Sequence, residues 1–270
     1  PDWQGVVMTK KSYGRKDRDR RGIPRKDNVA SITINEEKRR ITFTTNDMLT
    51  KQIQRDGPLV AKSFDRLTKR QMAECSKVCG RVQGALVRHL PRMDDDDFEA
   101  TAARLLFSAS NALVASIEVA RHGYPRQYGP LARVMIETLA TVVVLAIKKG
   151  ALAEFHAGTL SSTKCVTWSK EALPPLGQYW GMLSNTFVHI GKDHADFEGP
   201  VAYKQNDMAL QFVMTSVRGN VWLLDVVTDL VYSDSGNGRY WRRNGPEAWF
   251  EPTPDVQLWT EEFVRNKEPG

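Results

Sequence analysis

The amino-acid sequence predicts a mainly α-helical protein: a helical bundle with a short N-terminal β-hairpin and a docked aromatic C-terminal tail. Apolar residues recur at three- and four-residue intervals through the middle of the chain, and two short runs near its start alternate between apolar and polar residues. The last part combines glycine and proline with many aromatic residues. We therefore expect a basic arm at 1–28, a β-hairpin at 29–46, a helical bundle at 47–233 and an aromatic tail at 234–270.

The arm is dense in positive charge. Between residues 10 and 26, nine cationic side chains face only Asp17 and Asp19, which gives this stretch a net charge of +7. It has too few apolar residues to build a core of its own. We expect its cations to contact the phosphates of RNA or DNA. The cations are Lys10, Lys11, Arg15, Lys16, Arg18, Arg20, Arg21, Arg25 and Lys26.

The hairpin is predicted from Ser31–Ile34 and Ile41–Thr44, two β-prone runs around a polar turn. A first helical region follows from about Thr45 to Leu90, with Asn46 or Asp47 as its cap. We expect a break in this region near Gly57-Pro58.

The helical pattern is strongest after the acidic run at 94–97, whose carboxylates suit the positive end of a helix that starts near Phe98 and ends at Gly123. The next helix is apolar on most of its surface, as in a central helix packed on all sides. We expect this helix at about 127–149. Further helical segments are expected at about 151–172, 177–189 and 207–232, with a break at Pro174-Pro175.

The tail contains six aromatic residues, and this argues that it docks on the bundle, because disordered tails rarely hold so many. They are Tyr240, Trp241, Trp249, Phe250, Trp259 and Phe263.

The composition favours a cytoplasmic protein with no membrane partner. No stretch of about 18 uncharged apolar residues is present, and the longest apolar run, Leu139–Ile147, ends at two lysines. Cys75 and Cys79 lie four apart and are expected to be reduced thiols, because no pair of further ligands suggests a zinc site. We expect no cofactor and no metal.

Arg133 and Glu137 interrupt the most apolar helix at positions i and i+4, where an unpaired charge would be costly. One interpretation is an internal ion pair that fixes the register of neighbouring helices. The other is a catalytic cleft in which Arg133 receives a phosphate or carboxylate and Glu137 acts as a base.

A second polar group lies in Tyr179–His189, where Tyr179, Ser184 and His189 interrupt an apolar segment. On an α-helix Ser184 and His189 point about 140° apart, so a serine activated by His189 is not expected. His189 and His194 could offer two imidazoles to a metal, but their spacing is not a known metal signature. We expect His189 to meet Arg133 and Glu137 in space, as catalytic residues or as a structural network, with Tyr179, Ser184 and His194 in support.

These short motifs resemble a widespread bacterial helical family of unknown function. The resemblance runs from Asn111 to His194: a helix ending in Gly123-Tyr124, a helix with Arg133-x-x-x-Glu137, then Tyr179-x-x-x-x-Ser184 and His189. Such domains look like distant relatives of HEPN helical bundles, which occur in toxin, RNA-processing and phage-defence settings. Active HEPN ribonucleases carry an arginine and a later histidine separated by four to six residues, and no histidine of this chain has an arginine at that spacing.

Three functions therefore stay open. The first is a nucleic-acid-associated bundle of bacterial or phage-defence type, with phosphates bound by the arm. The second is a hydrolytic or phosphoryl-directed enzyme that uses Arg133, Glu137 and His189. The third is a non-catalytic interaction or oligomerisation protein.

Overall fold

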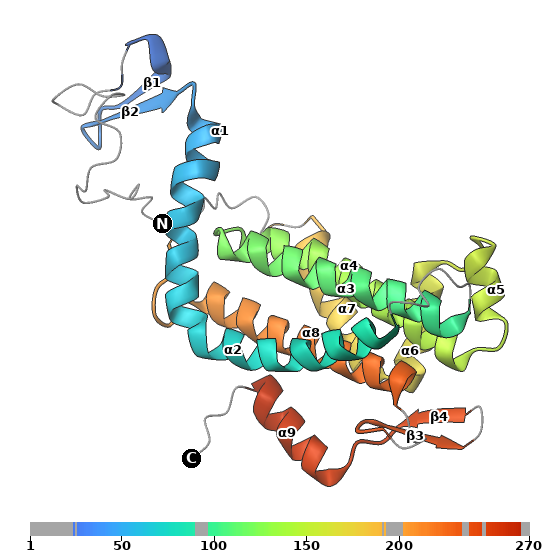
Figure 1. Ribbon diagram of the computed structural model, residues 1–270. Helices are drawn as coiled ribbons and strands as arrows, with labels where there is room; N and C mark the ends of the chain where they lie inside the picture. Colours follow the sequence, from blue (N-terminus) through green and yellow to red (C-terminus); the bar gives the residue numbers. More distant parts are fainter. Residues whose placement is uncertain are drawn as a thin grey trace. The chain divides into compact units, whose positions relative to one another are not determined.

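The computed structural model describes residues 26–89, 97–190, 202–233, 238–244 and 247–265, together with Pro24 and Lys192 (Figure 1). It confirms the mainly α-helical fold. The chain divides into two units, Pro1–Pro58 and Leu59–Gly270, which are described separately.

The first unit contains the predicted hairpin. Strands β1 (Val29–Asn35) and β2 (Arg40–Thr45) pair antiparallel, with Ile32 opposite Phe43 and Ile34 opposite Ile41. The Asn35 side chain accepts a hydrogen bond from the Lys38 amide in the turn, at 2.8 Å between Oδ1 and N. A 3-10 turn, η1 (Lys26–Asn28), precedes the hairpin.

A continuous helical run follows the hairpin. It comprises α1 (Met48–Lys51), a π-helical turn η2 (Gln52–Asp56) and α2 (Gly57–His89). The break expected at Gly57-Pro58 is therefore wrong. The π-helical turn η2 lies directly before Gly57 and Pro58, so the helical backbone changes its hydrogen-bond spacing where Pro58 lacks an N–H.

The second unit is a bundle built around α4 (Pro125–Ile147), which packs against α3, α6, α7, η4 and α8 (Figure 1). Tyr128, Met135, Ile136 and Leu139 of α4 are completely buried, so the prediction of a central helix is confirmed. The other elements are α3 (Phe98–Arg121), α5 (Ala151–His156), α6 (Ser162–Ala172), α7 (Pro174–Leu183), a π-helical turn η4 (Ser184–Val188) and α8 (Met208–Tyr232).

Helix ends follow local chemistry. Asp97 caps α3, because its side chain accepts a hydrogen bond from the Ala100 amide at 2.8 Å. Gly123 follows the helix with a positive φ of 91°, a conformation that favours glycine. Gly158, with a φ of 68°, separates α5 from α6 in the region expected to be one helix.

The tail docks on the bundle as predicted. Tyr240 and Trp241 are completely buried, and the Trp241 indole donates to the Val226 carbonyl of α8 at 2.9 Å. However, β structure is not confined to the N-terminal hairpin. Strands β3 (Trp241–Asn244) and β4 (Glu247–Phe250) form a second antiparallel hairpin before α9 (Pro254–Arg265).

Two helices, α3 and α4, are long and apolar enough to cross a membrane, although no uncharged run of about 18 residues occurs. About half of each apolar window, 50% for α3 and 56% for α4, is buried inside the unit. Core helices of soluble proteins pass the same test, so this observation is weak evidence for a membrane span.

Candidate functional site

The predicted Arg133–Glu137 pair is present and has a third member. Arg133 Nε donates to Glu137 Oε1 at 2.9 Å, and the indole Nε1 of Trp180, on α7, donates to the same oxygen at 3.0 Å. The Arg133 guanidinium lies 4.8 Å from the centre of the Trp180 ring, a cation–π distance. This cluster ties α7 to the central helix.

The cluster is only partly buried, since the Arg133 and Glu137 side chains keep 25% and 24% of their surface exposed. His189 does not join it. Its side chain is exposed after the end of η4, and no hydrogen bond or ion pair links it to Arg133 or Glu137. The described residues therefore do not form one bonded network of all three side chains, and their meeting in space stays a prediction.

The supporting residues serve the packing of helices. The buried Ser184 hydroxyl donates to the Trp180 carbonyl at 2.7 Å, so its proton is already used. The Tyr179 hydroxyl lies against Gly219 of α8, where any side chain would overlap it. His194 and the arm cations from Lys10 to Arg25 lie outside the described residues, and Lys26 is exposed in η1.

The most deeply buried charges of the bundle lie on α8, and the sequence analysis missed them. Asp225, 7% exposed, accepts hydrogen bonds through Oδ2 from Arg81 at 2.9 Å, Arg239 at 3.2 Å and the Tyr240 hydroxyl at 2.9 Å. One helical turn later, the Asp229 carboxylate accepts a hydrogen bond from the Tyr240 amide. These carboxylates hold the tail on α8. The rule that singled out Arg133, a charge inside an apolar helix, applies to them equally.

A buried chain of polar groups joins α4 to α8. Asn220 Nδ2 donates to the Tyr128 hydroxyl at 2.8 Å, which donates to the Ser216 hydroxyl at 2.9 Å. Burial raises the pKa of Tyr128 far above its usual range. The phenol therefore stays protonated and acts as a structural donor, while Asn220 Oδ1 has no partner among the described residues.

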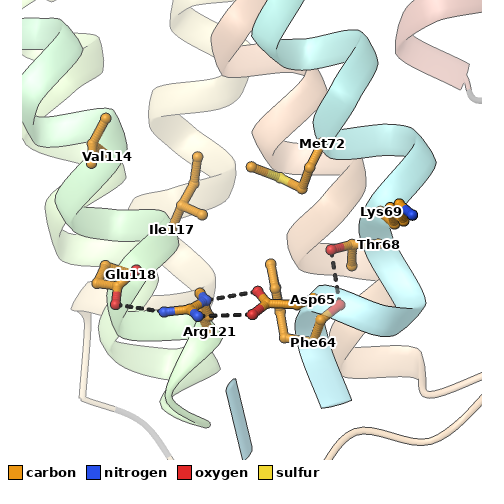
Figure 2. Close-up of a pocket in the computed structure, with 9 residues that line it drawn as sticks. All are labelled: Phe64, Asp65, Thr68, Lys69, Met72, Val114, Ile117, Glu118 and Arg121. Carbon is orange, nitrogen blue, oxygen red and sulfur yellow. Dashed lines mark hydrogen bonds and ion pairs between the residues drawn. The ribbon is translucent and has the colours of Figure 1, made fainter. Parts of the chain in front are cut away.

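A groove of about 420 Å³ lies between α2 and α3 (Figure 2), a volume within the usual range for small-molecule sites. Phe64, Met72, Val114 and Ile117 give it apolar walls. At one end Arg121 binds both oxygens of Asp65, at 2.7 and 2.8 Å, and Glu118 at 2.9 Å.

Three of the charged side chains of this groove, Asp65, Glu118 and Arg121, pair with one another. Arg121 holds the pKa of Asp65 below its usual range, so the carboxylate stays ionised. The Thr68 hydroxyl donates to the Phe64 carbonyl at 2.9 Å, so its proton is already used. The groove can receive an apolar group, but it does not present a paired nucleophile and base.

Charge separates the two units sharply. Residues 1–58 contain 14 cationic and 8 acidic side chains, whereas residues 59–270 contain 24 of each. The whole net charge of +6 therefore belongs to the first unit, and the helical unit is neutral.

Among the described residues, no group of three or more His, Cys, Asp or Glu side chains could hold a metal ion. Comparison with known proteins adds no further assignment: no protein-family model, curated protein or solved structure matches the chain.

Proposed function

We propose that this protein binds nucleic acid through its first unit and that the neutral helical unit is the body attached to it. The observation that carries the proposal is the charge partition: an excess of six positive charges in residues 1–58 and none in the remainder. Clustered lysine and arginine side chains bind phosphate backbones by releasing condensed counterions, without regard to base sequence.

An enzymatic role has weaker support. Arg133 and Glu137 satisfy each other and Trp180, and the exposed His189 makes no hydrogen bond or ion pair with them among the described residues. The first unit has no such internal balance, so a polyanion is the partner that its composition favours. The distant likeness to HEPN bundles agrees with a nucleic-acid setting and supplies no catalytic residue.

The salt dependence of binding tests the proposal. We suggest replacing Lys10, Lys11, Arg20 and Arg21 by glutamine, which keeps the length of the arm. A matched control replaces Lys62, Lys77, Lys164 and Lys170, exposed lysines of the helical unit. Affinity for a duplex and for a single-stranded oligonucleotide is then measured by fluorescence anisotropy across a salt series.

We expect the arm variant to bind more weakly and to flatten the plot of log affinity against log salt. Each lost contact removes about 0.9 from the slope for duplex DNA and about 0.7 for single strands. The control variant should keep the wild-type slope. Equal effects of the two variants, or no binding by the wild type, would contradict the proposal.

A further inference from the structure

The hairpin of the first unit exposes one apolar face. Directly opposed residues of an antiparallel pair share a face, and so do residues two apart on one strand. Ile32, Phe43, Ile34 and Ile41 therefore lie together. The three isoleucines are 56%, 66% and 58% exposed, in chain order.

The opposite face is polar. It carries the pairs Ser31 with Thr44, Thr33 with Thr42 and Asn35 with Arg40. The hairpin thus separates apolar from polar side chains as a strand pair does when one face is buried, yet its apolar face is exposed as well as its polar face.

The described part of this unit, residues 26–58, contains no buried hydrophobic side chain, whereas the buried core of the chain begins at Val60. A two-stranded hairpin is marginally stable in water unless its apolar face is covered. The covering surface must therefore be apolar and must come from outside this part of the unit.

We propose that the apolar face of the hairpin is the contact between two copies of this chain. The face contains no charged residue, so two identical faces can meet about a two-fold axis without placing like charges opposite each other. Phosphate groups, by contrast, gain nothing from isoleucine side chains. The polar face, with Arg40, remains open to solvent in such a pair.

The available area suits a dimer of modest strength. The three exposed isoleucines offer well under the about 800 Å² per partner of a standard stable interface. We therefore expect a dimer that dissociates at micromolar concentrations and not an obligate one.

The arm gives this dimer an unusual salt dependence. Each arm carries a net charge of +7 between residues 10 and 26 and precedes the hairpin in the sequence, so two copies bring like charges together. Salt screens this repulsion over about 10 Å at 0.1 M and about 3 Å at 1 M. Dimerisation should therefore strengthen as salt rises, whereas binding of nucleic acid should weaken.

Sedimentation equilibrium on the full chain without nucleic acid tests the inference, at low and high salt. Ile34→Glu places a carboxylate in the centre of the face and should raise the dimer dissociation constant about a hundredfold or more. Thr33→Glu introduces the same charge at the neighbouring exposed position of the polar face. We expect this control to change the constant by about twofold or less.

Ile34→Thr keeps a β-branched residue on the strand, so it separates loss of the interface from loss of the hairpin. It should weaken the dimer in the same direction as Ile34→Glu. A wild-type chain that stays monomeric at high salt, or equal effects of Thr33→Glu and Ile34→Glu, would overturn the inference. Binding of wild-type monomer to phosphatidylserine vesicles, lost in Ile34→Glu, would overturn it in favour of a lipid surface.

Discussion

Glu74 of α2 accepts a hydrogen bond from Arg218 of α8 at 2.7 Å between Oε2 and Nη1. Arg218 is only 3% exposed and lies in a buried stretch of α8. Its Nε also donates to the Phe263 carbonyl of α9, and its guanidinium lies 4.6 Å from the centre of the Phe263 ring. One buried cation therefore joins three helices.

Replacing Arg218 by leucine should destabilise the protein by about 2–4 kcal/mol, because it removes a buried charge-assisted hydrogen bond and leaves the Phe263 carbonyl without its donor. We expect α9 to become accessible to proteases before the remainder of the bundle. Urea unfolding and timed proteolysis with mass spectrometry measure both effects.

Arg70 provides a matched control, since it pairs with the same carboxylate from the surface at 3.6 Å with 61% of its side chain exposed. Arg70→Leu should change stability by less than about 1 kcal/mol. Equal losses for the two variants would show that Arg218 acts only as another surface partner of Glu74.

Gly219 and Gly84 should respond oppositely to alanine. A methyl group at Gly219 would overlap the Tyr179 hydroxyl and ring, so Gly219→Ala should cost about 1–3 kcal/mol. At Gly84 of α2 a methyl group meets nothing within 4 Å, and Gly84→Ala should stabilise by about 0.5–1 kcal/mol through the higher helix propensity of alanine.

Thermal unfolding of both variants checks this pair. Adding Tyr179→Leu to Gly219→Ala should recover part of the lost stability, because leucine lacks the hydroxyl and ring atoms that the new methyl group would overlap. Additive losses in the double variant would mean that the close approach of α7 to α8 is not the cause.

Helices α3, α4 and α8 could be predicted from the sequence because a period of 3.6 residues records which face is buried. The contact of Arg133 with Glu137 followed from their spacing on one helix. The second hairpin did not follow, because its strands have four residues each and depend on the packing of Trp241 against α8.

The partners of Asp225 could not be predicted from residue spacing either. Arg81 precedes it by 144 residues and Tyr240 follows it by 15, so only the tertiary fold brings them together. The π-helical turn η4 before His189 could not be predicted from a period of 3.6 residues either. The cost of burying a charge shows that Arg218 and Asp225 need partners, but not which ones.

Stability should fall at alkaline pH. Burial raises the pKa of the Cys75 thiol to about 12, and it raises the pKa of Tyr240 further above its usual range, with Asp225 adding to the effect. Both groups are neutral in the folded protein, while in the unfolded chain the thiol has a pKa of about 8.5 and the phenol a pKa of about 10. The stabilisation is therefore complete below about pH 8.5 and is lost as pH rises toward the folded-state values.

Urea unfolding at pH 7, 9 and 10.5 measures this loss. Cys75→Ala should reduce the decline between pH 9 and 10.5, and Tyr240→Phe should reduce the part that begins near pH 10. A free energy of unfolding that stays constant up to pH 10.5 would contradict the assignment of these groups as buried and neutral.

The last prediction separates the two roles of Glu137. Glu137→Gln keeps an oxygen that can accept from the Trp180 indole and loses only the ion pair with Arg133, which is partly solvated. We expect it to cost less than about 1 kcal/mol. Glu137→Ala also leaves the indole N–H without its acceptor, and should cost about 1–3 kcal/mol. Urea unfolding ranks the two variants, and equal losses would show that the ion pair within α4, and not the indole hydrogen bond from α7, accounts for the loss of stability.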